Sequence, residues 1–221
     1  MEIGNNLTYP SVIIDGDDNI LLFARRTDHL IGKDPVAKLV FYKIDSNLNV
    51  SDEQTLIESR YHGYSDFSLS MDFDKTINRL HLIVNVHENS NDLEYGINQT
   101  IVYLYSDNFG LNWRSNHNSS DLSLPLDSLS FNPIFKGGHF FGNNISLGNV
   151  FVDQNSLVHF LFTVESFSVG YLYYAVLNQD DFSYKKLFHP SSYAKVKPIL
   201  QISREILQIK SKFIFVNFPN N

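Results

Sequence analysis

A short unit recurs along this chain, in which an apolar run is followed by an acidic turn and a second apolar run. Copies of the unit lie near residues 12–24, 68–86, 149–164 and 199–209. The first copy has the turn Asp15-Gly16-Asp17-Asp18 between two apolar runs. Two short apolar runs joined by such a turn predict a β-hairpin. A chain built from these hairpins is constrained to fold mainly as antiparallel sheets.

The aromatic content favours the same fold class. The 221 residues include 18 Phe and 12 Tyr, and aromatic side chains are enriched in strands. Frequent Asn and Ser favour turns over helices. The one candidate helix, over residues 180–187, has a poor helical period. We therefore predict an all-β protein and, since no domain boundary is visible, a single domain over residues 1–221.

The repeated hairpins leave two architectures open. Small antiparallel sheets repeated along one chain are typical of a β-propeller, which closes radially and leaves few exposed edges. The units are irregularly spaced at roughly 50–75 residues, somewhat above the ~40–50 of common propeller blades. A two-sheet sandwich is the alternative. From this pattern we favour the propeller.

Charge and residue usage exclude several function classes. A net charge of -7 argues against nucleic-acid binding through a basic surface. The absence of cysteine excludes a disulfide scaffold, a thiolate metal site and a cysteine nucleophile. The eight histidines show no metal-ligand spacing, so we expect no metal and no cofactor. No apolar run approaches the roughly 18 residues that span a bilayer, and we see no signal peptide.

The segment Ser106-Asp107-Asn108-Phe109-Gly110-Leu111-Asn112-Trp113 carries a recognisable turn motif. It resembles the Asp-box, the Ser-x-Asp-x-Gly-x-Thr-Trp hairpin turn of sialidase-type propellers. Ser106, Gly110 and Trp113 match in register, while Asn108 stands for the Asp. We expect Asn108 to bond the turn backbone, Gly110 to adopt a positive φ, and Trp113 to anchor the turn to a sheet.

The N-terminal half carries further landmarks in order. Thr8 to Ser11 precedes the first hairpin, whose second run ends in Arg25 and Arg26, and Ser65-Asp66-Phe67-Ser68 begins a later strand. This order resembles the opening of the sialidase superfamily. The resemblance implies a six-bladed propeller, of which this chain would form about four blades at roughly 50 residues each. It also implies an exo-α-sialidase at the cell surface or outside the cell, with a sialylated glycan or other carbohydrate as partner.

The resemblance assigns roles to individual residues. Asp34 fits the catalytic acid/base, with Asp28 as its substitute, and Arg25, Arg26 and Asp66 fit sugar-binding positions. Two departures leave the activity open. Thr8 stands where the first carboxylate-binding arginine belongs, and Gln201 stands at the closest fit to the glutamate that activates the nucleophilic tyrosine.

Other interpretations stay open beside the sialidase. One is a non-catalytic Asp-box propeller that binds a glycan or a protein, and another is a propeller glycosidase acting on arabinan or fructan. At the level of residues, Asp28 and Asp34 also fit solvated loop carboxylates, and Asp66 also fits a turn cap. Arg25 and Arg26 also fit charged residues that simply flank the end of a strand.

Overall fold

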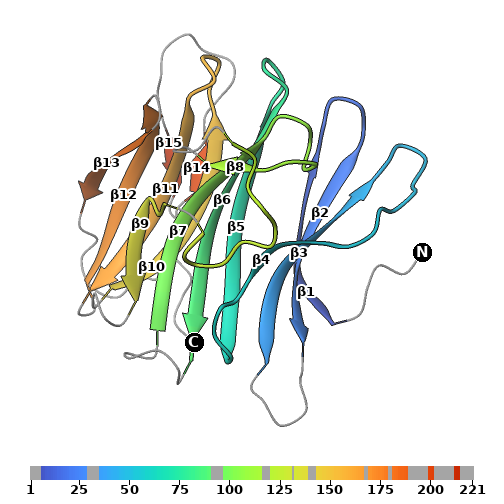
Figure 1. Ribbon diagram of the computed structural model, residues 1–221. Coiled ribbons are helices and arrows are strands. Elements are labelled where there is room, and N and C mark those ends of the chain that lie inside the picture. The colour runs from blue at the N-terminus through green and yellow to red at the C-terminus, as the bar shows by residue number, and fades with distance from the viewer. Residues whose placement is uncertain are drawn as a thin grey trace.

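The computed structural model of the chain describes residues 6–28, 35–90, 97–115, 120–130, 132–138, 143–166, 169–178, 181–188, 199–201 and 212–214. Every regular element in these ranges is a strand, which confirms the all-β prediction (Figure 1). The segment predicted as a candidate helix is instead strand β13, Asp181–Phe188. It pairs along its neighbour β12, Val169–Asn178, so sheet hydrogen bonding prevails over its weak helical period.

The strands form three antiparallel sheets. The first has the order β1 (Leu7–Ile14), β2 (Ile20–Asp28), β3 (Val36–Ile44) and β4 (Gln54–Glu58). The second has nine strands in the order β13-β12-β11-β10-β9-β7-β6-β5, with β8 paired to β7. Its other members are β5 (Tyr64–Asp74), β6 (Arg79–Asn89), β7 (Ile97–Ser106), β8 (Arg114–Ser115), β9 (Phe135–Gly138), β10 (Asn143–Val152) and β11 (Val158–Ser166). The third is the hairpin of β14 (Ile199–Gln201) and β15 (Lys212–Ile214).

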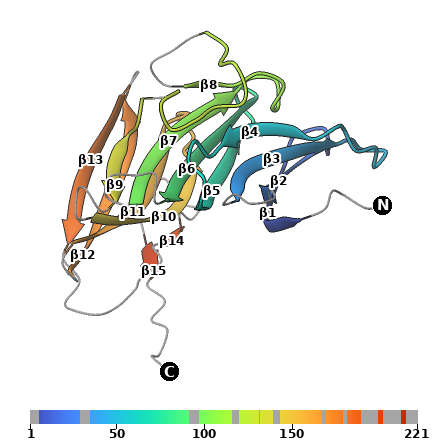
Figure 2. The ribbon, with the colours of Figure 1, turned by 60° about the horizontal axis from the view of Figure 1, so that its bottom comes forward.

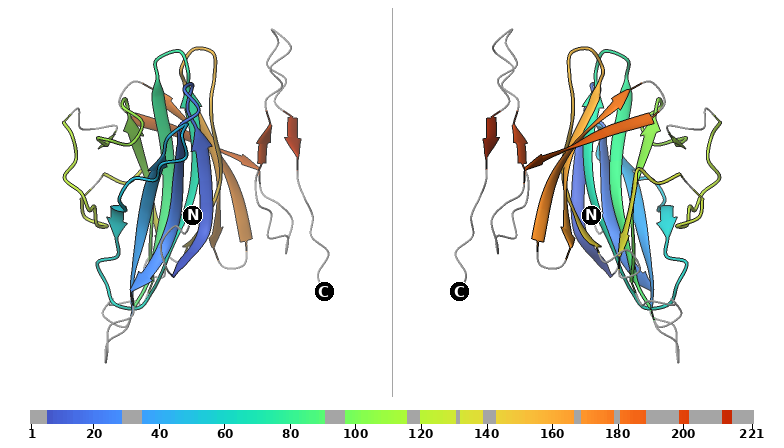
Figure 3. Two further views of the ribbon diagram at one scale, coloured as in Figure 1. Left: turned by 90° about the vertical axis from the view of Figure 1, so that its right-hand side faces the viewer. Right: turned by 90° about the vertical axis from the view of Figure 1, so that its left-hand side faces the viewer.

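The sheets lie in a row rather than in a ring. The first sheet lies beside β5, at the opposite end of the molecule from β13 (Figure 2). Hairpin β14–β15 lies on one side of the two larger sheets, and the segment carrying β8 lies on the other (Figure 3). No closed propeller is formed by the residues that the structure describes, so the expected six-bladed ring with about four blades present is not found there.

Strands β6 and β7 are buried on both faces, between two hydrophobic cores. Leu80, Leu82 and Val84 face the first sheet and pack with Phe23 and Trp113. The alternate residues face β10 to β13, where Ile83, Ile101 and Tyr103 pack with Phe160 and Phe162. A strand covered on both sides reads as a near-continuous apolar run, as Leu80 to Val86 does. Polar residues within that run are therefore placed inside the protein.

The nine-stranded sheet folds back so that β10 lies against β5. Ser70 Oγ accepts a hydrogen bond from the backbone N–H of Val150 at 2.7 Å. Two residues further along each strand, Asp72 Oδ2 accepts a hydrogen bond from the backbone N–H of Val152, also at 2.7 Å. Side chains of β5 thus satisfy backbone donors of β10. This contact brings strands of distant sequence together around the site described below.

Three of the acidic turns share one hydrogen-bond pattern. Asp15, Asp45 and Asp153 each accept, through Oδ1, bonds from the backbone N–H groups two and four residues later. Each also donates its own N–H to the carbonyl four residues later. The fourth residue of each turn has a positive φ: 60° at Asp18, 66° at Leu48 and 60° at Ser156. The Asp therefore supplies the bonds that hold a left-handed residue in a tight turn.

Leu48 is an unfavourable residue for its turn position. Its side chain is 66% exposed and contributes little packing, while a non-glycine residue in the left-handed region costs free energy. We expect Leu48→Gly to raise the free energy of unfolding by about 0.5–1 kcal/mol. Urea denaturation would measure the change. Leu129→Gly, at an exposed turn residue outside the positive-φ set, is the control; an equal gain in both variants would contradict the backbone explanation.

His81 makes the stability of the fold dependent on pH. The side chain is 2% exposed on β6, and its Nδ1 lies 2.8 Å from the Tyr103 hydroxyl. Burial, with a smaller effect of the Arg79 charge, lowers the pKa of His81 to about 4. Because this pKa lies below the unfolded value near 6.5, the unfolded chain binds more protons between pH 6.5 and 4. Stability is therefore lost as the pH falls through this window.

The variant His81→Gln tests this linkage. Between pH 7 and pH 4.5 we expect the wild-type protein to lose about 2–3 kcal/mol more stability than the variant. Urea unfolding of both proteins at the two pH values measures these losses of stability. The contributions of other titrating groups cancel when the loss in the variant is subtracted from that in the wild-type protein. Parallel losses in both proteins would show that His81 is not protonated on unfolding.

Candidate functional site

Two adjoining cavities lie where the end of β2 meets the start of β5. The larger, of about 400 Å³, is called the Arg25 cavity and is lined by Asn6, Thr8, Arg25, Thr27, Pro35, Ala37, Gly63, Tyr64 and Ser65. The smaller, of about 230 Å³, is called the His87 cavity and is lined by Tyr64, Asp66, Ser68, Asn85, His87, Gln99 and Ile145. Tyr64 lines both, so a single extended ligand can contact the two cavities.

Arg25 is the cation of the larger cavity, and several groups fix its position. Its Nε donates to Thr8 Oγ1 at 3.1 Å, and one terminal nitrogen donates to the Ser65 carbonyl at 3.2 Å. The same nitrogen lies 3.9 Å from Asp66 Oδ1. The guanidinium also lies over the rings of Tyr9 and Tyr64, at 4.7 and 5.4 Å from their centres. An arginine held in this way is preorganised for an anionic group.

A bulge in β1 brings Tyr9 to this cation. The pairing of β1 with β2 shifts register between Thr8 and Ser11, and Tyr9 within the shift has a φ of 55°. Bulges of this kind redirect a side chain at the edge of a sheet. The ring of Tyr9 remains largely exposed, so it offers an aromatic face to a ligand as well as to Arg25.

Gly63 allows the chain to enter β5 beside Tyr64. Its φ is +140°, and a Cβ placed there would lie 2.4 Å from the Asn89 carbonyl oxygen. No other residue fits this approach without a shift of the backbone. The following residue, Tyr64, is half exposed, and its ring stands edge-on to the His87 ring at 6.2 Å. Gly63 thus positions the side chain that joins the two cavities.

Strand register assembles the polar wall of the His87 cavity. Asp66 on β5 lies opposite His87 on β6, and His87 lies opposite Gln99 on β7. Cross-strand partners share one face of a sheet, so these three side chains form one row. Asn85, two residues from His87, lies on the same face. Ile145 of β10 lines the cavity beside them.

The His87 cavity combines a neutral imidazole with a buried acceptor group. Burial lowers the pKa of His87, and the charges of Asp66 and Glu88 oppose this effect only in part. The imidazole is therefore neutral at pH 7. Asn85 donates through Nδ2 to the Ile145 carbonyl at 3.2 Å. Its Oδ1 is buried and has no hydrogen-bond partner among the described residues. A buried acceptor of this kind calls for a donor, and a ligand hydroxyl fits that need.

A buried carboxylate supports the site from behind. Glu88 is 0% exposed and accepts bonds from Ser59 Oγ at 3.2 Å and the Arg60 N–H at 3.0 Å. Its other oxygen accepts from Asn98 Nδ2 at 3.0 Å. Ser59 Oγ in turn lies 2.8 Å from Ser65 Oγ, next to the carbonyl that holds Arg25. Glu88 therefore ties β6 and β7 to the segment that leads into β5.

The structure separates the residues selected from the sequence. Arg25 and Asp66 meet at the two cavities. Arg26 extends from the opposite face of β2, as alternation along a strand requires, and pairs with Asp28 at 3.0 Å and with Glu53. Asp28, the substitute for Asp34, belongs to that ion-pair group. Asp34 lies outside the described residues, as does most of the 199–209 unit.

Several residues of the site were not identified from the sequence: Tyr64, Asn85, His87, Glu88 and Gln99. One signal was available, namely that Asn85 and His87 stand two residues apart in an otherwise apolar run. In a strand buried on both faces, such a pair shares one side and needs polar partners. The partners themselves come from β5, β7 and β10, which local sequence does not bring together.

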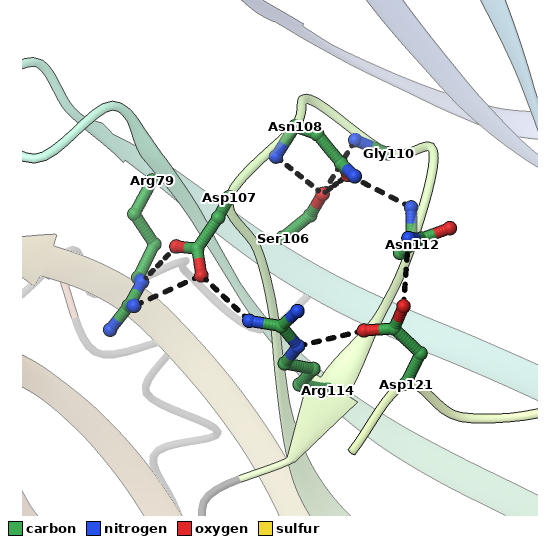
Figure 4. A network of polar contacts seen from close by, with 8 residues as sticks. All are labelled: Arg79, Ser106, Asp107, Asn108, Gly110, Asn112, Arg114 and Asp121. Atoms are coloured by element: carbon green, nitrogen blue, oxygen red, sulfur yellow. Dashed lines mark hydrogen bonds and ion pairs between the residues drawn. The ribbon is translucent and has the colours of Figure 1, made fainter. Parts of the chain in front are cut away.

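The turn at Ser106–Trp113 is held by side-chain hydrogen bonds, shown in Figure 4. Ser106 Oγ accepts from the Gly110 N–H at 2.8 Å and donates to Asn108 Oδ1 at 3.0 Å. Asn108 Oδ1 also accepts from the Asn112 N–H at 2.8 Å. Gly110 has a φ of +89° and packs on Leu21 of the first sheet. The turn therefore lies against the first sheet, away from the two cavities.

An ion-pair chain lies beside this turn (Figure 4). Asp107 pairs with Arg79 at 2.5 Å and with Arg114 at 3.2 Å, and Arg114 also pairs with Asp121 at 2.7 Å. Arg79 lies over the Tyr105 ring at 4.3 Å. All four charged groups are satisfied by one another, which indicates a structural role.

Two features are absent from the part of the chain that the structure describes. It contains no group of three or more His, Asp or Glu side chains arranged to hold a metal ion. Within the same ranges, no helix has the length and apolar character needed to cross a membrane.

Comparison with known proteins shows a fold relationship to polysaccharide lyases. No protein-family model and no curated protein matches the sequence. Among solved structures, an ulvan lyase of polysaccharide lyase family PL25 matches with a TM-score of 0.68 at 10% identity, over 88% of this chain and 47% of that chain. The same figures hold for this lyase bound to -[GlcA(1-4)Rha3S]-. The polysaccharide lyase Uly1 matches with a TM-score of 0.65 at 13% identity, over 97% of this chain and 50% of that chain.

These comparisons correct the resemblance to sialidases. The solved structures named above are polysaccharide lyases, and neither the family comparison nor the sheet arrangement of the described residues supports a sialidase-type Asp-box propeller. At such low identity the likeness concerns the fold, and the chain spans about half the length of the lyases it matches. The sialidase interpretation was wrong because its landmarks were hairpin and turn signals, which many all-β proteins share.

Proposed function

We propose that this chain binds an acidic polysaccharide across the Arg25 and His87 cavities. The observation that carries the proposal is Arg25, which lies over two tyrosine rings and donates to two neutral acceptors, with the Asp66 carboxylate at 3.9 Å. A guanidinium binds carboxylate or sulfate through paired, charge-assisted hydrogen bonds. The exposed faces of Tyr9 and Tyr64 suit the apolar faces of sugar rings. Within this proposal residues 1–221 act as a single domain.

The fold relationship supports the same ligand class. The ulvan lyase was solved with a chain of glucuronate and sulfated rhamnose, whose acidic groups are a carboxylate and a sulfate. The net charge of -7 gives this protein no general attraction for a polyanion. Binding therefore depends on local contacts at Arg25, and we expect it to tolerate moderate salt better than binding to a basic surface would.

A titration with defined oligosaccharides tests the proposal. We expect glucuronate–rhamnose-3-sulfate oligosaccharides to bind, and carboxyl-reduced and desulfated forms to bind more weakly, in isothermal titration calorimetry. A neutral arabinan oligosaccharide is the matched control. Equal affinity for the acidic and neutral ligands, or no binding of either, would refute the acidic-polysaccharide proposal.

Eliminative cleavage is a second candidate function, favoured by the closeness of Tyr64 and His87 in a lyase-like fold. In that reaction a base removes the proton from C5 of a uronate, the C4–O bond breaks, and a C4–C5 double bond forms. The leaving oxygen receives a proton. The unsaturated product absorbs ultraviolet light, so a steady absorbance rise with the acidic polysaccharide would support cleavage. Binding without such a rise would restrict the protein to recognition.

A further inference from the structure

Gln99 occupies a buried position between three strands. It extends from β7, and its carboxamide contacts β10 on one side and β6 on the other. Its Oε1 accepts the backbone N–H of Ile145 at 2.7 Å. Its Nε2 lies 2.8 Å from Nδ1 of His87. Both halves of the amide are thus engaged.

The directions of these bonds determine where the proton of His87 resides. A backbone N–H can only donate, so the Gln99 atom facing Ile145 must be the oxygen. The nitrogen then faces His87 and, since an amide NH₂ group only donates, Nδ1 of His87 must accept. A neutral imidazole carries one proton. That proton is therefore on Nε2.

We propose that Gln99 is a positioning residue that holds His87 as the Nε2–H tautomer, so that His87 donates a hydrogen bond to an oxygen of the bound polysaccharide. The assignment of the tautomer stands on geometry alone, while the ligand part rests on the proposed function. Two charged groups near His87, Asp66 and Glu88, oppose the effect of burial without removing it. The imidazole therefore remains neutral and carries a single proton, as the assignment of that proton to Nε2 requires.

The tautomer also defines the ligand group that the His87 cavity prefers. Asn85 Oδ1 is a buried acceptor on the same face of β6, two residues from His87. A sugar hydroxyl that accepts from His87 Nε2–H keeps a proton of its own for a neighbouring acceptor such as Asn85 Oδ1. A sulfate or carboxylate can only accept and would leave Asn85 unsatisfied. The structure thus assigns a free hydroxyl to the His87 cavity and the acidic group to Arg25.

The isosteric variant Gln99→Glu reverses the hydrogen bond at His87. A carboxylate accepts from the Ile145 N–H and from His87, so the imidazole must carry a proton on Nδ1. Nε2 then either becomes an acceptor or stays protonated in an imidazolium, and the nearby negative charge raises the pKa of His87. Gln54→Glu, at an exposed glutamine of β4, adds the same charge without contact to His87 and is the matched control.

Two-bond ¹H–¹⁵N correlation spectra of the full chain at pH 7 read the tautomer directly. The signals of His87 are assigned by their loss in His87→Gln. We expect an unprotonated Nδ1 and a protonated Nε2 in the wild-type protein and in Gln54→Glu, and a protonated Nδ1 in Gln99→Glu. A wild-type Nδ1–H signal would overturn the proposal by itself, even if Gln99→Glu fails to fold.

Ligand binding separates this proposal from the function on which it depends. At a pH where the same spectra show a neutral imidazole in Gln99→Glu, its Nε2 carries no proton. There we expect Gln99→Glu to bind the glucuronate–rhamnose-3-sulfate oligosaccharide roughly tenfold more weakly than Gln54→Glu, since one hydrogen bond is lost. If the spectra show the Nε2–H tautomer but the wild-type protein binds no acidic oligosaccharide, the proposed function fails and the positioning role of Gln99 stands. Equal binding by the two variants at that pH overturns the donor role of His87.

Discussion

Replacing Trp113 with alanine is expected to lower the free energy of unfolding by about 3–5 kcal/mol. Trp113 is 0% exposed and meets the rings of Phe23 and Phe41 edge-on, at centroid distances of 6.0 and 5.9 Å. Both phenylalanines are fixed in paired strands, so they cannot move to fill the cavity. Because Trp113 is the single tryptophan, urea unfolding would be followed by circular dichroism rather than by its fluorescence.

Two control variants separate the role of the ring from that of the turn. Trp113→Phe retains an aromatic ring and should cost clearly less than the alanine variant. Leu111→Ala changes an exposed residue of the same turn and should alter stability by no more than about 0.5 kcal/mol. A loss below about 1 kcal/mol in Trp113→Ala would mean that the turn does not depend on this anchor.

The anchor illustrates which parts of the fold the sequence could predict. Hairpins with acidic turns were predicted from local signals, since Asp15 and Asp153 each accept the backbone N–H groups two and four residues later. Their pairing is confirmed for β1–β2, β5–β6 and β10–β11. The order of the sheets depends on contacts such as that of Ser70 with Val150, 80 residues away. No local pattern encodes such a contact, and the propeller expectation failed at that level.

The residues of the site likewise divide into those that the sequence could predict and those that it could not. Arg25 and Arg26 were indistinguishable in sequence, because both end the same strand. Strand alternation places them on opposite faces, and only the partner strands decide which face carries a cavity. Asp66 was selected with them and does reach Arg25. Asn85 and His87 of β6 and Gln99 of β7 form a site only through the register of these two strands, so their roles emerge from the structure.

Neutralising Arg25 tests the proposed function most directly. We expect Arg25→Met to weaken binding of the acidic oligosaccharide about 100-fold, because each bond to a charged group contributes about 1.5–3 kcal/mol and a guanidinium forms two. Arg25→Lys restores the charge without the paired geometry, so we expect it to recover only part of the affinity. Isothermal titration calorimetry on the three proteins measures the series.

The neighbouring arginine provides the matched control. Arg26→Met removes the same charge from the adjacent position, but its partners are Asp28 and Glu53 on the other face of the strand. Its affinity for the acidic oligosaccharide should match that of the wild-type protein, although its stability can fall because two carboxylates lose their cation. Equal losses of affinity at both positions would indicate a diffuse effect of net charge. A loss at Arg25 alone requires a ligand bound on the face that carries Tyr9, Tyr64 and Asp66.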